Sequence, residues 1–501
     1  MTMIPLCSGF RGNALLGSLL GLSLVLTGCG GGGGSDGPPS DGSQALIELP
    51  EDVPRNDLPC GGSDAIMLDK NDLTASAKLA FITAQSGDVI VFPEGKYQID
   101  DTLTLDGTLS GLTLDGVTIC GQGIDKTVLD FTDSVGDDAL FMTNLSNVEI
   151  YGMAIIEAAN NALKIQDADG VYIHDVATVW EGEPDSGNGA YGLYPVESAN
   201  VLIEDSYVRG SADAGVYVGQ SDRIVVRNNI AEWNVAGMEI ENSTNADMYS
   251  NIARHNTGGL LVFDLPIGNG KYGSGVRVFD NTVVANNTQN FANHSSNPGG
   301  VHIVPPGTGV IVLSTNDVEI YNNTIDQHDT LAVVATSFLI AEPDLNSPSY
   351  GAVADGWSPL VRNIYIHDNT ITNAGGNPNG TIIEPILAVF EGYGKAFPQI
   401  LYDGLGEQMA NSGLLNAMGE VAYTADDKIC QESNGASVLA GFVYDPDEPT
   451  TLDGDGNPIP SPDSGPNLLN CTHSGLSPAT VTFAGVDHGC GSDDNGDACQ
   501  L

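Results

Sequence analysis

The stretch AYGLYPVES, residues 190–198, is echoed three times further along the chain. The matching stretches are DAGVYVGQS (213–221), VAGMEIENS (235–243) and TGGLLVFDL (257–265). Their aligned glycines are Gly192, Gly215, Gly237 and Gly259, at steps of 23, 22 and 22 residues. A repeat of this length predicts similar structural units stacked on one another. We expect the glycines to let the chain turn where the units stack.

The residues between these stretches also repeat, as NVLIEDSYV (200–208), RIVVRNNIA (223–231) and ADMYSNIAR (246–254). Their apolar and polar residues alternate, which is typical of half-buried strands. An asparagine recurs after this strand, and such side chains can bond to one another as a ladder. The series is Asn229, Asn251, Asn281, Asn323 and Asn369, with Ser206 in the same position one coil earlier. Short strands without intervening helices predict a parallel β-helix, because the LxxLxL pattern of leucine-rich repeats is absent.

Residues 71–99, NDLTASAKLAFITAQSGDVIVFPEGKYQI, predict a short amphipathic helix, a strand and a turn that cap the stack. Together with LTLDGVTICGQGIDKTVLDF (112–131), this stretch resembles the opening of right-handed parallel β-helix proteins of the pectate-lyase-like superfamily. Residues 146–390 resemble the carbohydrate-binding and sugar-hydrolase repeats of that superfamily. More narrowly, the chain is similar to a group of exported bacterial β-helix lipoproteins. The resemblance implies an all-β, single-stranded right-handed parallel β-helix, a solenoid with an N-terminal helical cap and an irregular, disulfide-bearing C-terminal region.

The first residues have the pattern of an export signal. Arg11 precedes the apolar stretch 14–26, which is too short to span a membrane and ends in LTGC (26–29). This ending resembles a bacterial lipobox, which implies that Cys29 is lipidated; Gly30 after it favours the outer membrane, on the periplasmic or cell-surface side. The predicted divisions are a lipoprotein signal peptide (1–28), lipidated Cys29 with a flexible Gly/Ser/Pro tether (29–59), the β-helix (60–400), and a C-terminal cap with an Asp/Gly/Cys-rich tail (401–501).

The charge and the cysteine content limit which classes of partner and cofactor we expect. The chain has 16 Lys and Arg against 65 Asp and Glu, which argues against nucleic acid. Six cysteines remain after the signal and Cys29, and an exported protein is expected to pair them, with 15 possible pairings. No cofactor is certain; calcium is possible, although neither DGDGNP (453–458) nor SDDNGDAC (492–499) completes a calcium loop. The disulfide candidates are Cys60, Cys120, Cys430, Cys471, Cys490 and Cys499.

Strand parity selects the candidate site. It points Leu193, Val216, Met238 and Leu260 inward and the columns Tyr194–Tyr217–Glu239–Leu261 and Val196–Gly219–Glu241–Phe263 outward. Glu239 and Glu241 are the candidate catalytic pair, because i, i+2 residues lie ~6.7 Å apart and inverting glycosidases separate their carboxyls by ~6.5–9.5 Å. The alternative is that both acids are simply solvated. The candidate substrate-binding residues are Tyr194, Glu197, Tyr217, Asp264, Arg254 and Trp357, the last on an exposed loop; no metal ligands are predicted.

Two neighbouring patterns bear on function. YGLYPVES (191–198) resembles the mannuronan C5-epimerase fingerprint, tyrosine–glycine–x–aspartate–proline–histidine–aspartate, but its histidine is Val196 here, which disfavours epimerase activity. The column Arg209–Glu232–Arg254 is interpreted as a surface ion ladder. The resemblance implies a lipid-anchored protein that binds or processes an extracellular or cell-wall polysaccharide, as a hydrolase, a lyase or a non-catalytic binder. The alternative is a non-catalytic envelope module that presents a β-helix face to a protein partner such as an exported c-type cytochrome.

Overall fold

The structure is a computed structural model that describes residues 45–56, 58–108, 113–293, 300–392, 394, 396–435, 439–441, 469–490 and 492. Residues 45–501 form one compact unit. The predicted signal peptide and Cys29 lie outside the described residues. Residues 45–56 belong to the folded unit and not to the predicted tether, because Ile47 and Val53 are buried in an apolar cluster with Tyr207 and Ile230.

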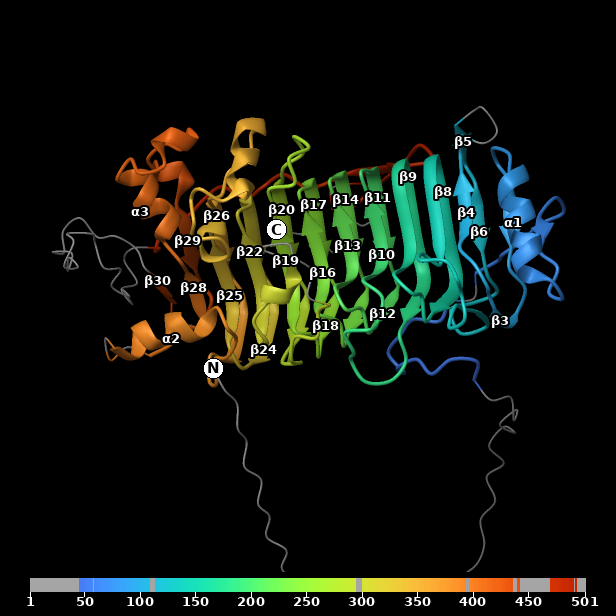
Figure 1. The fold of residues 1–501 in the computed structure, drawn as a ribbon, viewed down its shortest axis with the longest axis horizontal. Helices are drawn as coiled ribbons and strands as arrows, with labels where there is room; N and C mark the ends of the chain where they lie inside the picture. Colours follow the sequence, from blue (N-terminus) through green and yellow to red (C-terminus); the bar gives the residue numbers. More distant parts are fainter. Residues whose placement is uncertain are drawn as a thin grey trace, which may run out of the picture. The chain divides into compact units, whose positions relative to one another are not determined.

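The chain winds into a right-handed parallel β-helix, as predicted, with three parallel sheets along its length (Figure 1). The first sheet contains β10 (Tyr191–Val196), β13 (Ala214–Gly219), β16 (Ala236–Glu241), β19 (Gly258–Phe263), β22 (Thr308–Leu313), β25 (Leu331–Thr336), β28 (Ile400–Tyr402) and β30 (Leu439–Gly441). The second contains β11 (Ala199–Glu204), β14 (Asp222–Arg227), β17 (Thr244–Tyr249), β20 (Ser274–Phe279), β23 (Asn316–Tyr321), β26 (Arg362–His367) and β29 (Ile429–Glu432). The third contains β12 (Tyr207–Arg209), β15 (Ile230–Glu232), β18 (Ile252–Arg254), β21 (Thr282–Val284), β24 (Thr324–His328) and β27 (Thr370–Ala374).

The first coils are built from longer and shorter strands. β9 (Asn161–Val179) runs through all three sheets, because it pairs in turn with β10, β11 and β12. β8 (Leu140–Ile156) pairs with β9 along its whole length. The strands before them are β1 (Ile66–Met67), β2 (Val89–Val91), β3 (Gly95–Gln98), β4 (Leu103–Asp106), β5 (Leu114–Asp115), β6 (Thr118–Cys120) and β7 (Thr127–Asp130).

The predicted register of the repeats is confirmed. Tyr217 pairs with Glu239 and Glu239 with Leu261, while Gly219 pairs with Glu241 and Glu241 with Phe263. The inward column is buried in the core of the solenoid and comprises Leu193, Val216, Met238 and Leu260. The column of Arg209, Glu232 and Arg254 is confirmed as well. Period-2 side-chain alternation is therefore sufficient to assign faces to these strands.

The predicted asparagine ladder is present between the second and third sheets. The Asn229 side-chain amide donates to Asn251 Oδ1 at 3.1 Å and to the Ile203 carbonyl at 3.0 Å. The same pattern continues through Asn281, Asn323 and Asn369 to Asn434. A second ladder, which the sequence reading did not find, links Asn234, Asn256 and Asn286. Buried amides thus satisfy the backbone at both corners of the third sheet.

The aligned glycines lie within strands of the first sheet, so the expectation that they serve as turn residues is wrong. A β-carbon on Gly237 would lie 2.5 Å from the Gly259 carbonyl oxygen, and one on Gly192 would lie 2.4 Å from that of Gly215. Glycine is needed at these aligned positions because the backbone of each coil lies too close to that of the next to leave room for a side chain. Close approach, and not a left-handed backbone, explains the repeat.

Helices cap the N-terminal end and cover part of one face. The predicted N-terminal helix is confirmed as α1 (Leu73–Thr83), which buries Leu73, Ala77 and Phe81 against the core. α3 (Leu405–Asn411) falls in the predicted C-terminal cap, whereas α2 (Ile383–Gly392) was not expected. Short 3-10 segments are η1 (Val301–Ile303), η2 (Phe338–Ile340), η3 (Pro348–Asp355), η4 (Asn416–Met418) and η5 (Ala425–Asp427). β28, β29 and β30 extend the solenoid beyond the predicted boundary at residue 400.

Part of the C-terminal tail lies along the second sheet. Its hairpin of β31 (Val481–Phe483) and β32 (Val486–His488) is antiparallel, and Ala479 and Val481 pack against Leu202 and Val225. Four predicted cysteines pair as Cys60–Cys120 and Cys430–Cys471. Cys490 is disulfide-bonded too, and Cys499 lies outside the described residues. One disulfide thus lies toward each end of the solenoid.

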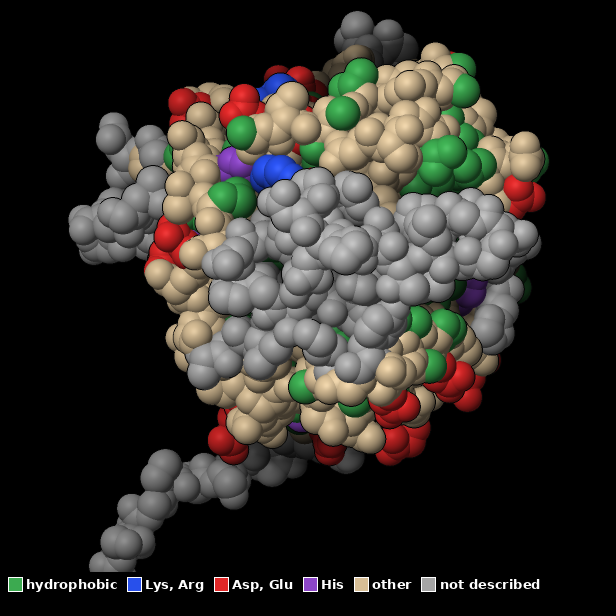
Figure 2. All heavy atoms as spheres, turned by 90° about the vertical axis from the view of Figure 1, so that its left-hand side faces the viewer, with side chains coloured by type: hydrophobic (Ala, Val, Ile, Leu, Met, Phe, Trp, Pro, Cys, Tyr) green, Lys and Arg blue, Asp and Glu red, His purple; other side chains and the backbone are tan. Residues whose placement is uncertain are grey.

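The surface is acidic and lacks a membrane-spanning helix in the part of the chain that is described. In the end view of Figure 2, acidic side chains lie at several places around the edge, in keeping with the formal net charge of −49. Among the described residues, every helix is too short or too polar to cross a bilayer.

Candidate active site

The outer face of the first sheet is covered by inserted segments that build a second apolar cluster. We call it the outer cluster; it includes Phe263, Phe338, Trp357, Phe390 and Leu401. The segments that supply it are η1, η2, η3, α2 and α3, which interrupt the regular coils after β21. Side chains that point outward from β13, β16 and β19 are consequently removed from water.

A cavity of about 240 Å³ lies on this face beside the outer cluster. We call it the acid pocket, because three carboxyl groups, those of Asp213, Glu239 and Glu241, line it. Its other described lining residues are Tyr191, Phe263, Leu265, Asn293, Gly300, Val301 and His302. β16 places Glu239 and Glu241 on the same face, with Ile240 between them pointing into the core. The pocket therefore combines rigid strand-borne acids with residues from an inserted segment.

Burial changes the chemistry of these acids. Glu239 is only 1% exposed. Its burial raises the pKa of its carboxyl well above the ordinary range, and the negative charges of Glu241 and Asp213 raise it further. Burial likewise raises the pKa of Glu241 to about 7 and that of Asp213 to about 7. Desolvation disfavours an ionised carboxyl, and a neighbouring negative charge adds to the effect. The three carboxyl groups therefore take up protons at higher pH than exposed acids do.

Hydrogen bonds distinguish the two glutamates. The Tyr217 hydroxyl donates to Glu241 Oε1 at 2.9 Å, which favours the ionised form of Glu241 and partly opposes burial. Glu239 Oε2 is buried and has no hydrogen-bond partner among the described residues. Buried carboxyl oxygens without partners are rare, because removing them from water is unfavourable. Glu239 is thus the group with an unmet bonding capacity.

Three tyrosine rings stand next to the acids. Tyr191 lies 4.4 Å from Tyr194 and 4.8 Å from Tyr217 between ring centroids, and Tyr194 lies 5.0 Å from Tyr217. The Lys164 ammonium lies 5.5 Å from the centroid of the Tyr194 ring. Tyr217 is buried and Tyr194 is half-buried, so the ring cluster extends from the buried pocket toward the protein surface.

The predicted catalytic pair lies in the acid pocket, and Tyr217 bonds to it. The alternative of two solvated acids is wrong, because inserted segments cover the sheet and both glutamates are buried. Asp264 is adjacent: it is buried, and its pKa is raised by burial and by Glu241 to about 8. Tyr194 belongs to the ring cluster beside the pocket.

The other predicted binding residues lie elsewhere. Glu197 accepts a hydrogen bond from Gln166 at 2.8 Å and lines a separate open depression with Gln220. Arg254 is on the third sheet, where it forms ion pairs with Asp52 and Glu232. Trp357 is 2% exposed, so the prediction of an exposed loop aromatic is wrong; its indole donates to the Asp264 carbonyl at 2.9 Å within the outer cluster.

Tyr191, Asp213 and His302 are among the pocket residues that sequence reasoning missed. Tyr191 carried a signal, because its column continues with Ala214, Ala236 and Gly258 and a large ring is exceptional there. Asp213 lies one residue before β13, where the repeat has no charged counterpart. His302 comes from an inserted segment that has no period, so nothing in the repeat points to it.

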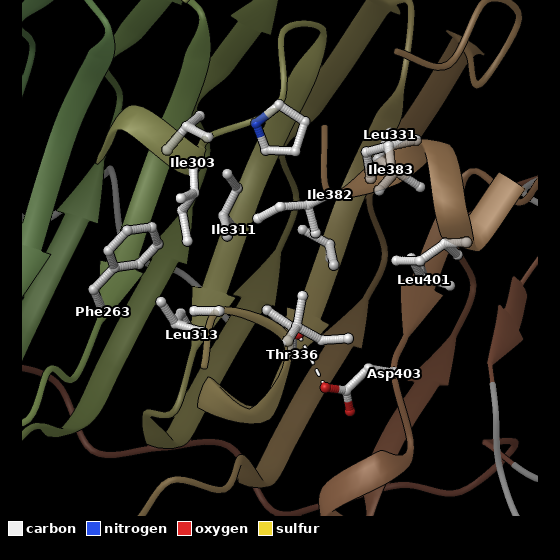
Figure 3. A pocket seen from close by; sticks show the side chains of 16 residues that line it. Phe263, Ile303, Ile311, Leu313, Leu331, Thr336, Ile382, Ile383, Leu401 and Asp403 are labelled. Atoms are coloured by element: carbon white, nitrogen blue, oxygen red, sulfur yellow. Dashed lines mark hydrogen bonds between the residues drawn. The ribbon is translucent and has the colours of Figure 1, made fainter. Parts of the chain in front are cut away.

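A neighbouring apolar pocket has a different character (Figure 3). It shares Phe263 with the acid pocket, and aliphatic side chains such as Ile311, Ile383 and Leu401 dominate its wall. Its one acid, Asp403, accepts hydrogen bonds from the Ser337 hydroxyl at 2.6 Å and the Thr336 hydroxyl at 3.0 Å. Because that carboxyl is occupied by structural bonds, the apolar pocket offers no acid–base chemistry.

An open groove of about 560 Å³ lies at the corner between the third and first sheets. We call it the aromatic groove; Trp233, His255 and Phe291 are among its lining residues. The Trp233 and His255 rings are stacked with centroids 4.9 Å apart, and both residues have left-handed backbones, with φ of 61° and 60°. Bulky residues seldom adopt that conformation, which costs roughly 1–2 kcal/mol.

A metal centre is not formed by the described residues. None of their His, Cys, Asp and Glu side chains gather in threes with an arrangement that could hold a metal ion. The two stretches considered for calcium, 453–458 and 492–499, lie outside the described residues except for Ser492, so calcium there stays a prediction.

A family comparison supports the fold. Residues 138–325 match the family described as right handed beta helix region, in line with the expected pectate-lyase-like β-helix. The chain is similar to the mannuronan C-5 epimerase AlgE4 A-module of Azotobacter vinelandii, with 16% identity over 68% of this chain and 92% of that one and a TM-score of 0.38. It is also similar to a family 28 exopolygalacturonase of Yersinia enterocolitica, with 11% identity over 66% and 67% of the two chains and a TM-score of 0.39.

No curated protein matches the chain in sequence. At these identities and TM-scores, the structural similarities carry no argument about function. The acid pocket must therefore be interpreted from its own residues.

Proposed function

We propose that the protein is a glycan-processing enzyme of the bacterial cell envelope that hydrolyses a glycosidic bond in the acid pocket. One observation carries the proposal: Glu239 and Glu241 lie on one strand beside a cavity, and their burial raises the pKa of both. Glycosidases use two carboxyl groups in different protonation states across the scissile bond.

The environments of the two glutamates suit different roles. Burial and the neighbouring acids raise the pKa of Glu239 and so favour its protonated form, which suits a general acid that gives its proton to the leaving oxygen. Glu241 has a pKa of about 7 and a tyrosine donor, so it ionises more readily and serves as the base or nucleophile. Asp213 shares the negative charge of the pocket and helps to keep Glu239 protonated.

A polymeric substrate is supported by the aromatic groove. Asn287 to Phe291 line the groove and Asn293 lines the acid pocket, so the short stretch 287–293 borders both. The acid pocket is small for a ligand site, since such sites are typically about 300–1,000 Å³, and it suits a single sugar unit. The groove offers aromatic surface for further units, because aromatic rings present large, rigid contact area.

The experiment incubates the full-length protein with neutral, amino and acidic polysaccharides and measures new reducing ends and unsaturated products separately. Hydrolysis predicts reducing ends without unsaturated products. Glu239→Gln and Glu241→Gln should each lower turnover by about 100-fold or more, as expected for loss of a general acid or base. Trp233→Ala should raise KM for long chains and leave short substrates unaffected.

Glu232→Gln is the matched control, because Glu232 is a buried glutamate on the third sheet, outside the pocket. It removes one partner of the ion pair with Arg254 and should leave the turnover of the folded protein unchanged. Unsaturated products would instead indicate a lyase. If folded protein releases no product from any glycan, or if both glutamine variants retain full turnover, the hydrolase proposal is rejected.

A further inference from the structure

We propose that the acid pocket recognises an ammonium group, so that its substrate is a glycan with a free amino sugar. The inference rests on the proposed function for its chemistry, but it concerns which sugar the pocket selects. Three features carry it: the sign of the charge in the pocket, the unpartnered oxygen of Glu239, and the tyrosine cluster.

The pocket is rich in negative charge and poor in positive charge. Asp213, Glu239 and Glu241 line it, and none of its described lining residues is Lys or Arg; His302 is the one basic side chain there. Burial is the main reason that the three pKa values are raised, and repulsion between like charges adds to the rise for Glu239 and Asp213. A ligand cation relieves this repulsion. A uronate or sulfated sugar would add a further negative charge, so the pocket disfavours acidic glycans.

The second feature is the carboxyl oxygen Oε2 of Glu239, which has no hydrogen-bond partner among the described residues. Glu239 is only 1% exposed and lines the cavity. A primary ammonium group carries three donors and no acceptor, which complements a carboxyl-lined cavity. An N-acetyl group has one donor and an added acceptor oxygen, so it matches the same set of acceptors less well.

The tyrosine rings complete the match to a cation. The faces of aromatic rings carry partial negative charge, and clustered rings beside acids are a recurring way to bind ammonium groups. Tyr191 lines the cavity and contacts Tyr194 and Tyr217. The Lys164 ammonium already lies 5.5 Å from the Tyr194 ring, so this cluster accommodates a positive nitrogen on one side.

The test compares two short oligosaccharides of equal length, one of glucosamine and one of N-acetylglucosamine, by calorimetric titration of the full-length protein. Measurements at about 0.3 M salt screen the general attraction of cations to this acidic surface. We expect the glucosamine oligomer to bind about ten- to 100-fold more tightly, which is the range for hydrogen bonds to charged groups.

Substitutions then test whether the preference for glucosamine arises in the acid pocket. Glu239→Gln and Glu241→Gln should each remove most of the preference for glucosamine, whereas Glu232→Gln should keep it in full. Equal binding of both oligomers, or preference for the acetylated one, overturns the ammonium inference. The hydrolase proposal survives that result if the enzyme still cleaves a neutral glycan and fails with it if no glycan is cleaved. A preference that persists in both glutamine variants also overturns the inference, because it would arise outside the pocket.

Discussion

Glu241 illustrates how one buried acid couples stability to pH. Its pKa is raised to about 7 in the folded protein, against 4.5 for the unconstrained group, so the folded state binds the proton more tightly than the unfolded state does. The contribution of Glu241 to stability is therefore complete below about pH 4.5 and is lost as pH rises through about 7. The size of the loss is on the order of 3 kcal/mol, because each pKa unit corresponds to about 1.4 kcal/mol.

We predict that the free energy of unfolding falls between about pH 5 and pH 8, and that Glu241→Gln falls less steeply over the same range. Urea unfolding at several pH values measures both slopes. His174, whose pKa is raised to about 9, contributes a loss of the same sign, so the difference between parent and variant is the informative quantity. Parallel slopes for the two proteins would show that Glu241 does not titrate in the pocket as described.

At the scale of the element, the glycine column sets how closely the coils of the first sheet approach. We predict that Gly237→Val lowers the free energy of unfolding by about 1–3 kcal/mol, the usual range for overpacking. The new side chain would meet the Gly259 carbonyl oxygen at 2.5 Å and the Asn256 amide at 2.9 Å. Gly376→Val is the matched control, because nothing lies within 4 Å of a β-carbon there. Equal melting temperatures for the two variants would contradict the close-approach account.

Periodicity explains why the strands were predictable and the site was only partly so. Glu239 and Glu241 could be assigned to the outward face because a strand alternates with period 2, and Asn229 to a ladder because it recurs. Their burial could not be predicted, since it depends on inserted segments such as η1 and α2, which lie outside the repeat. Trp357 was misjudged for the same reason: a loop in sequence is part of the outer cluster in space.

The whole molecule combines a closed solenoid with parts that no repeat predicts. Residues 45–56 pack on the third sheet, where Asp52 pairs with Arg254, and residues 469–490 pack on the second sheet. The first sheet has its own cover in the outer cluster, so each sheet is covered over at least part of its outer face. The acid pocket lies where the cover of the first sheet meets its regular coils, so strand-borne acids and inserted residues line the same cavity.

We propose that lipidated Cys29 attaches the protein to a membrane. The LTGC sequence at 26–29 motivates the proposal. We predict that Cys29→Ser moves the protein from the membrane fraction to the soluble fraction with its melting temperature unchanged, because residue 29 precedes the folded unit. Cys7→Ser is the matched control, since Cys7 lies within the predicted signal peptide and should not affect anchoring. Fractionation after a high-salt wash measures the difference, and the wash matters because it removes proteins held by surface charge alone. A Cys29→Ser protein that still sediments with membranes after the wash would mean that a surface of the solenoid, and not an acyl chain, holds the protein there.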